Sequence, residues 1–153
     1  MSETEDRNIE RQLAEQGFYV STTVGMSMWP MLRNRRDRVI ILPLGDERLK
    51  KYDLPLYRRP DGKYILHRVI GVREGKYIIR GDHTYVKEHI PDEWILGYVS
   101  EFYRKGRHIL ASSRWYRCYA AVWNALYPLR WLFHCARRAA AKCLRPFRRK
   151  RQN

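Results

Sequence analysis

The last third of the chain lacks acidic residues altogether. Residues 1–101 contain 17 lysines and arginines and all 16 acidic residues, whereas residues 102–153 contain the remaining 14 basic residues and no aspartate or glutamate. The formal charge of +15 is therefore concentrated in the C-terminal part, which follows a nearly neutral body. A cationic segment of this kind is attracted to anionic surfaces, either lipid headgroups or nucleic acid.

Cysteine is also scarce. The three cysteines, Cys118, Cys135 and Cys143, all lie in the basic segment, and none belongs to a C-x-x-C pair. An odd number without a secretory signal argues for reduced thiols and against a disulfide framework, and the spacing does not suggest a zinc site. We therefore expect neither a metal nor another cofactor.

Long hydrophobic runs are missing as well. The first 17 residues are acidic and polar, without the apolar core of a signal peptide, which predicts a cytoplasmic location for the body. The longest uncharged run in the basic segment, residues 118–129, is 12 residues long, whereas a spanning helix needs about 20. Tryptophans, tyrosines and arginines in this segment favour a helix lying on the cytoplasmic face of the membrane over one that crosses it.

With 153 residues the chain is long enough for one domain with a core and too short for two ordinary domains. A helix is predicted for residues 3–16, where Ile9 and Leu13 share a face and Gly17 follows. We expect an N-terminal helical segment at 1–17, a β domain at 18–111 and a helical tail at 112–153.

The middle of the chain has the alternation and turn spacing of a small antiparallel coiled sheet or barrel, so the fold class is mainly β. The last predicted hairpin turns at Lys105 and Gly106. From Ser112 the apolar period becomes helical and is interrupted near Pro128, which predicts a basic amphipathic helical hairpin. Strands are predicted at residues 18–24, 37–44, 53–59, 63–73 and 76–80, and in the hairpin at 94–110.

Ser27 lies between two methionines in VGMSMWPML, directly after the first predicted strand. A serine hydroxyl is a weak nucleophile unless a base within hydrogen-bond reach removes its proton. His67, in YILHRVIGV, has apolar neighbours that favour the neutral imidazole required of a base. A structural histidine bonded to the backbone is the competing interpretation. The other candidate bases in the body are His83, His89, Lys63, Lys76 and Lys87.

An ordered set of motifs resembles the type I signal peptidase and LexA-like serine peptidase superfamily. The set comprises GMSMWPML, DRVII, HRVIGV, a strand ending in GD, and ILGYV, and it covers roughly residues 20–103. The resemblance implies a signal-peptidase-like β fold. In that superfamily the serine of the first motif is the nucleophile, which is Ser27 here, and its backbone N–H is an oxyanion donor. His67 occupies the base position, as in the Ser/His branch found in endoplasmic-reticulum, archaeal and sporulation-type members.

The resemblance also implies an acidic partner for His67. Asp82 matches the aspartate of the GD motif and is our first candidate for orienting the imidazole. A second family aspartate is replaced here by Glu88, with Asp92 further along, so the identity of the third catalytic group stays open. Asp82 can equally be a turn residue after a strand. Candidate substrate-contacting residues are Met26, Met28, Pro30 and His83, the last replacing a usual asparagine.

The sequence therefore predicts a serine endopeptidase that cleaves a precursor or leader peptide, with a peptide or protein as substrate. A self-cleaving repressor is disfavoured, because no helix-turn-helix precedes Ser27 and the base position is not lysine. The alternative from another class is a non-catalytic module of the same fold that binds a membrane surface or nucleic acid. We expect an anionic membrane as the partner of the tail, and no recognised motif supports nucleic acid. The tail packing on the β domain as ordinary core is the remaining possibility.

Overall fold

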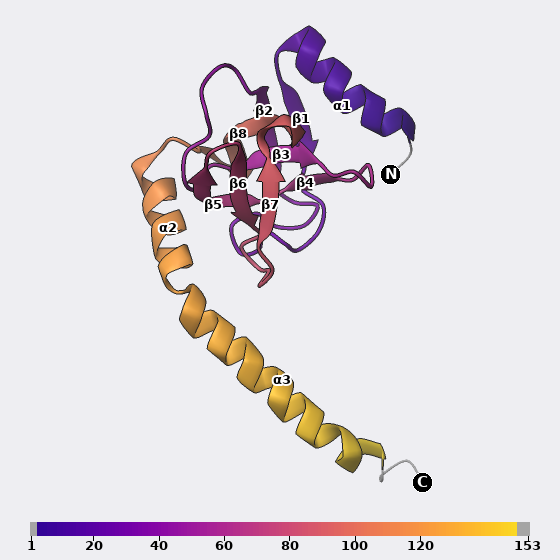
Figure 1. The fold of residues 1–153 in the computed structure, drawn as a ribbon, viewed down its shortest axis with the longest axis vertical. Coiled ribbons are helices and arrows are strands. Elements are labelled where there is room, and N and C mark those ends of the chain that lie inside the picture. The colour runs from indigo at the N-terminus through magenta and orange to yellow at the C-terminus, as the bar shows by residue number, and fades with distance from the viewer. Residues whose placement is uncertain (1–2, 150–153) are drawn as a thin grey trace.

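The computed structural model describes the backbone of residues 3–149 and the side chains of residues 9–140. The described chain is mainly β, with one helix before the strands and two after them (Figure 1). Every strand pair is antiparallel, and the strands curl into half of a barrel. The predicted fold class is therefore confirmed at the level of a mainly β, coiled antiparallel sheet.

The larger sheet has the strand order β1-β2-β8-β3-β4, and β9 pairs with the far end of β8. In β2 the side chains of Val39 and Ile41 alternate into the core, as expected for a strand with one buried face. Gly97 lets β8 approach β2 closely, because a Cβ there would lie 2.3 Å from the Leu42 carbonyl oxygen. The strands are β1 (Tyr19–Thr22), β2 (Arg38–Pro43), β3 (Pro55–Arg58), β4 (Tyr64–Leu66), β8 (Ile95–Arg104) and β9 (Arg107–Leu110).

The smaller sheet has the order β5-β6-β7. Its strands are β5 (Arg68–Arg73), β6 (Lys76–Arg80) and β7 (Glu88–Pro91), and a short 3-10 helix, η1 (Asp92–Trp94), leads back into β8. The single strand predicted at 63–73 is in fact two, because the chain changes sheet at His67. His67 thus lies in a break between β4 and β5 and not in the middle of a strand.

Helix α1 (Glu3–Gln16) closes one end of the half barrel. Its residues Ile9 and Leu13 are buried against the core of the larger sheet, which confirms the predicted helix and its apolar face. Glu10 fixes the helix to the sheet edge, since it accepts hydrogen bonds from the Tyr64 hydroxyl at 2.7 Å and from Arg58 at 3.3 Å.

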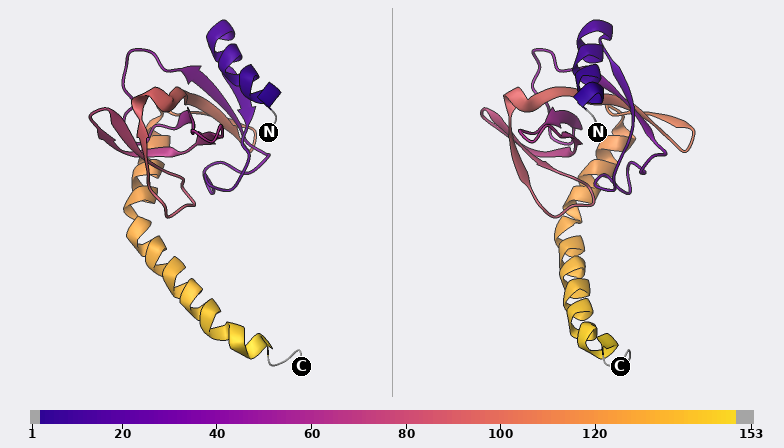
Figure 2. Two further views of the ribbon diagram at one scale, coloured as in Figure 1. Left: turned by 45° about the vertical axis from the view of Figure 1, so that its right-hand side comes forward. Right: turned by 90° about the vertical axis from the view of Figure 1, so that its right-hand side faces the viewer.

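The helices after the β body do not form the predicted hairpin. Helix α2 (Arg114–Ala125) packs on the body through Tyr116 and Ala120, and α3 (Tyr127–Arg149) continues away from it, so that the two make a bent rod (Figures 1 and 2). Pro128 is the second residue of α3, where a missing N–H costs no hydrogen bond, so the proline starts a helix and does not reverse the chain.

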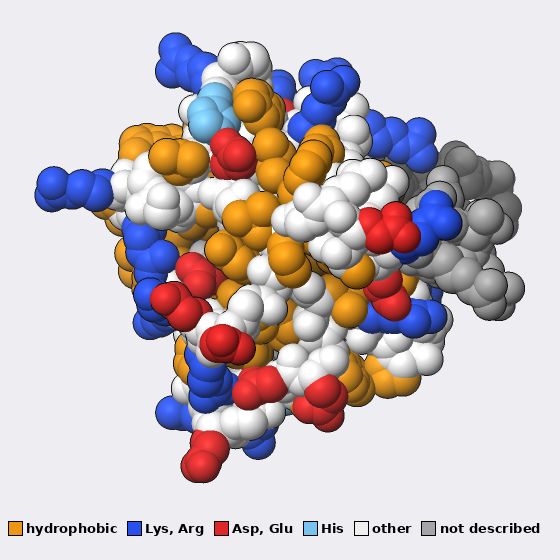
Figure 3. Space-filling model, turned by 90° about the horizontal axis from the view of Figure 1, so that it is seen from above, with side chains coloured by type: hydrophobic (Ala, Val, Ile, Leu, Met, Phe, Trp, Pro, Cys, Tyr) orange, Lys and Arg blue, Asp and Glu red, His pale blue; other side chains and the backbone are white. Residues whose placement is uncertain are grey.

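Seen from the end where α1 lies, hydrophobic side chains cross the middle of the surface and charged side chains surround them (Figure 3). Phe18, Val20 and Val24, around the first strand, are among the exposed large hydrophobic residues of the body. None of the helices within residues 3–149 combines the length and the apolar character needed to cross a bilayer.

Candidate active site

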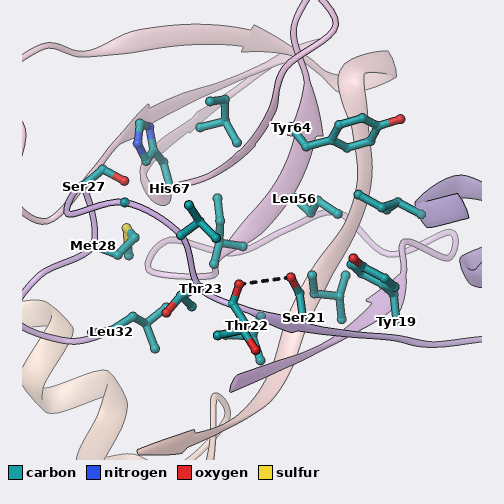
Figure 4. Close-up of a pocket in the computed structure, with 17 residues that line it drawn as sticks. Tyr19, Ser21, Thr22, Thr23, Ser27, Met28, Leu32, Leu56, Tyr64 and His67 are labelled. Atoms are coloured by element: carbon teal, nitrogen blue, oxygen red, sulfur yellow. Dashed lines mark hydrogen bonds between the residues drawn. The ribbon is translucent and has the colours of Figure 1, made fainter. Parts of the chain in front are cut away.

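An apolar cavity of about 190 Å³ opens between the first strand, the loop that follows it, and the β3-β4 hairpin. Ser27 and His67 both line this cavity, and their side chains lie beside one another at one end (Figure 4). The remaining wall is largely aliphatic and aromatic, with Leu32, Leu56 and Tyr64 as examples. The structure therefore brings together the two residues that the sequence predicted as nucleophile and base.

The loop that carries Ser27 is held at its base by a buried carboxylate. Asp37 is fully buried and accepts hydrogen bonds from the Arg33 backbone N–H at 2.7 Å and from the Arg33 guanidinium. The Thr23 hydroxyl donates to the Arg33 carbonyl at 2.9 Å, which ties the two ends of the loop together. Gly25, at φ +97°, allows the turn that leads into Ser27, a conformation that other residues rarely adopt.

The Ser27 backbone is fixed from the opposite side by the segment after β6. The Ser27 carbonyl oxygen accepts a hydrogen bond from the His83 backbone N–H at 2.7 Å. A Cβ on Gly81 would lie 2.7 Å from that same carbonyl oxygen and 3.1 Å from His67 Nε2. Only glycine leaves room for this close approach, so Gly81 spaces Ser27 and His67 relative to each other.

One ring nitrogen of His67 faces the cavity, and the other faces a carboxylate. The residue is buried, with 7% of its surface exposed. Its Nδ1 lies 3.2 Å from Glu88 Oε1 and 3.3 Å from the Tyr57 hydroxyl. Nε2 lies on the side of Gly81 and Ser27. This division leaves Nε2 as the nitrogen that can exchange a proton with a group in the cavity.

Glu88 is itself held by two neighbours. Its Oε2 accepts hydrogen bonds from the Tyr57 hydroxyl at 3.1 Å and from Arg59 Nε at 2.9 Å, and Arg59 Nη2 completes an ion pair with the same oxygen. These contacts fix the carboxylate in one orientation toward His67. Burial is the main cause that raises the pKa of Tyr57, with the charge of Glu88 next, so Tyr57 remains a neutral hydrogen-bond donor.

Burial lowers the pKa of His67 below its usual 6.5, and the negative charge of Glu88 opposes that shift without cancelling it. The imidazole is accordingly neutral at neutral pH, the form that accepts a proton. The Ser27 hydroxyl itself makes no hydrogen bond with any described residue. Catalytic hydrogen bonds commonly tighten only when substrate is bound.

Asp82 does not contact the imidazole in this structure. Its carboxylate forms a bidentate ion pair with Arg68, with both hydrogen bonds at 2.7 Å and both side chains buried. Arg68 also donates to the Tyr116 hydroxyl at 2.6 Å, which links the pair to α2. Burial is the largest single influence and lowers the pKa of Arg68, but the charge and hydrogen bonds of Asp82 together with the neighbouring Tyr116 outweigh it, so the pKa is raised. Of the two carboxylates considered from the sequence, Glu88 is the one beside His67.

Of the four predicted substrate-contacting residues, one lines the cavity and three do not. Met28 lines it and is buried. Met26 is half exposed outside it, and the Pro30 carbonyl accepts a hydrogen bond from Arg104. His83 packs edge-on against Trp29, with ring centroids 5.3 Å apart, in a separate cleft beside α3.

Tyr57, Arg59 and Gly81 are site residues that the sequence analysis did not single out. Tyr57 and Arg59 are two positions apart in and just after β3, so they point to the same side of the strand. That spacing was the available signal, but nothing in the sequence indicates which strand face meets Glu88. Among the described residues no cluster of His, Cys, Asp and Glu side chains is arranged to hold a metal ion.

In comparisons with known proteins, no family model matches the chain and no curated protein matches it.

Proposed function

We propose that the protein is a serine endopeptidase in which Ser27 is the nucleophile, His67 the general base and Glu88 the carboxylate that orients His67. The single observation that supports this most is the position of His67. Its Nδ1 is 3.2 Å from Glu88, and its other side shares a cavity with Ser27. Nucleophile, base and orienting acid are recognised as a set by this kind of geometry.

In the proposed first step, Ser27 Oγ forms a bond with the scissile carbonyl carbon while its proton passes to His67 Nε2. The negative charge on the carbonyl oxygen is stabilised by backbone N–H groups, and the Ser27 N–H, which has no acceptor among the described residues, is one such donor. His67 then gives the proton to the leaving amine as the C–N bond breaks. Water then gives a proton to His67 Nε2 and attacks the acyl carbon. The ester bond to Ser27 Oγ breaks, His67 returns the proton to Oγ, and the carboxylic acid product leaves.

Glu88 contributes by holding His67, and Asp82 contributes to the scaffold. With Nδ1–H donating to Glu88, the lone pair of Nε2 points to the cavity, and the carboxylate stabilises the imidazolium that forms. Asp82 and Arg68 join the end of β6 to the start of β5, directly beside His67. That buried pair fixes the backbone next to His67.

The cavity supports an extended peptide with an apolar side chain as the substrate. Its lining is largely aliphatic and aromatic, and β1 and β4, which border it, are the two ends of the larger sheet. Exposed strand edges bind extended peptides through main-chain hydrogen bonds, and adjacent pockets select the side chain. The proposed substrate is a precursor or leader peptide that binds in this extended form.

Covalent labelling tests the proposed nucleophile. A fluorophosphonate probe is expected to modify the wild-type protein at Ser27, as mapped by mass spectrometry, and to leave Ser27→Ala unmodified. Ser112→Ala, which removes a serine that does not line this cavity, is the matched control and is expected to label like wild type. Labelling that persists in Ser27→Ala would remove Ser27 as the nucleophile. No labelling of the wild type would favour the non-catalytic binding module.

A further inference from the structure

Helix α3 contacts the rest of the protein through its polar side. The Tyr127 hydroxyl donates to the Tyr85 carbonyl at 3.2 Å, and the Tyr85 ring stacks on His134 with centroids 4.2 Å apart. Arg130 donates to the Asp82 carbonyl and lies over the Trp123 ring, 3.8 Å from its centroid. Tyr127, Arg130 and His134 follow the helical spacing of three and four residues, so they form one face.

The apolar side of α3 is exposed, and Phe133 at its edge also lines the cleft that contains His83 and Tyr85. Leu129, Leu132 and Phe133 are 65%, 60% and 65% exposed, and Leu132 and Phe133 follow Leu129 by three and four residues, which places the three on one side of the helix. Ala136 and Ala140 extend the same side and are also exposed. A helix of a globular protein normally buries its apolar face and exposes its polar face. In α3 this arrangement is reversed, which leaves an apolar surface without a partner in the described chain.

The charge around this surface is uniformly positive. The sequence of α3 contains no acidic residue, and the exposed Arg137 and Arg138 follow Phe133 by about one turn. Trp131 is 48% exposed on the same helix, and tryptophan is typical of side chains that lie at the level of lipid headgroups. The further basic residues of α3 in the sequence are Lys142, Arg145, Arg148 and Arg149.

We propose that α3 docks by its outward apolar face on an anionic lipid surface, lying in the interface while its arginines meet the headgroups. A helix with an exposed apolar face, exposed tryptophan and arginine has the composition that such helices use. A second copy of the chain would bring the same positive charge to the contact, and like charges oppose association. Nucleic acid would engage the arginines but would leave Leu129, Leu132 and Phe133 in water. This inference does not depend on the proposed peptidase activity.

Vesicle co-sedimentation of the full chain tests the proposal. Wild type is expected to bind vesicles of phosphatidylcholine mixed with phosphatidylglycerol, to bind pure phosphatidylcholine at least about tenfold more weakly, and to be released by salt. Leu132→Ser with Phe133→Ser removes two exposed apolar side chains and is expected to weaken binding by about tenfold or more. Arg137→Gln with Arg138→Gln is expected to weaken binding to the anionic vesicles alone by about tenfold.

Matched pairs on the body serve as controls. Val86→Ser with Leu110→Ser removes two comparably exposed apolar side chains, and Arg36→Gln with Arg38→Gln removes two exposed charges. Both controls are expected to bind anionic vesicles like wild type. Circular dichroism and the unfolding midpoint verify that each variant is folded.

Three results would overturn the lipid proposal. The first is equal binding to the two kinds of vesicle, and the second is unchanged binding of the variant at Leu132 and Phe133. The third is a concentration-dependent dimer in analytical ultracentrifugation that this variant abolishes, because a second copy would then cover the face.

Discussion

Glu88 Oε1 lies 3.2 Å from Nδ1 of His67, whereas Asp82, which is closer to His67 in the sequence, is turned away from the ring into a bidentate pair with Arg68. The two carboxylates therefore have different surroundings. Glu88 is partly exposed and shares its oxygens among His67, Tyr57 and Arg59. Asp82 is buried with a single cationic partner. Glu88 contacts His67, whereas Asp82 belongs to a buried ion pair that holds the two strands together.

Glu88→Gln is predicted to change the pH profile of peptide cleavage. Because the pKa of His67 is lowered from 6.5 by burial and raised by the charge of Glu88, kcat/KM in wild type is expected to fall as the pH drops through a value below 6.5. Removing the carboxylate charge lowers the pKa of His67 further, so the acid limb moves to lower pH. The plateau of kcat is expected to fall at least about tenfold, since the imidazolium loses its stabilising partner. An acid limb at the wild-type pH would contradict a role for Glu88 beside the base.

Asp82→Asn is predicted to destabilise the protein. The substitution leaves the buried Arg68 cation without its counter-charge, which costs about 3–5 kcal/mol in the free energy of unfolding. Asp92→Asn is the control, because the side chains of Arg48 and Asp92 are 45% and 42% exposed, so that water screens this pair and a smaller loss is expected. Chemical denaturation of the three proteins measures the difference. Equal losses in the two variants would argue against a structural role specific to the buried pair.

Gly81→Ala is predicted to impair catalysis more than stability. Its methyl group would meet the Ser27 carbonyl oxygen at 2.7 Å and the His67 ring at 3.1 Å, so one of them must move. A displacement of that size at the reacting groups lowers kcat/KM by about a hundredfold. Gly45→Ala is the matched control, since a Cβ there meets nothing within 4 Å. Steady-state kinetics that show equal activity for both variants would remove Gly81 as the spacer.

The cavity predicts selectivity for an aliphatic side chain next to the scissile bond. A lining of residues such as Leu32, Leu56 and Met28 offers no partner for a charged side chain, whose burial is costly. In a peptide library, cleavage is expected after or near aliphatic residues of modest size and is expected to disappear when that position holds aspartate or lysine. Equal cleavage of charged and aliphatic peptides would place the substrate outside this cavity.

Local sequence patterns predicted the N-terminal helix and most strands of the described chain. Strand β2 alternates its apolar residues, and the turn at Lys105 and Gly106 joins β8 to β9 where glycine allows it. Strand β7 was missed, because its sequence EHIP has two polar residues and a proline and little β preference. Strand β7 forms because it pairs with β6, and the strand propensity of a short segment does not indicate such a tertiary contact.

The sequence motifs indicated the candidate site residues and their order along the chain. They did not indicate which carboxylate lies beside His67. Ser27 and His67 could be found from motifs, whereas the choice between Asp82 and Glu88 depends on which way each side chain turns after β6. That direction follows from two separate ion pairs, because Arg68 binds Asp82 and Arg59, which follows a strand of the other sheet, binds Glu88. The predicted C-terminal hairpin was wrong for a similar reason, since Pro128 can start a helix as well as end one.

The most direct test of the central claim is peptide cleavage by a matched set of variants. A peptide library read by mass spectrometry is incubated with wild type, Ser27→Ala, His67→Ala and His89→Ala, the last removing an exposed histidine of β7. We predict that kcat/KM falls about a thousandfold or more in the variants at Ser27 and His67 and stays within about twofold of wild type at His89. Cleavage at the wild-type rate and sites by either Ser27→Ala or His67→Ala would contradict the proposed mechanism.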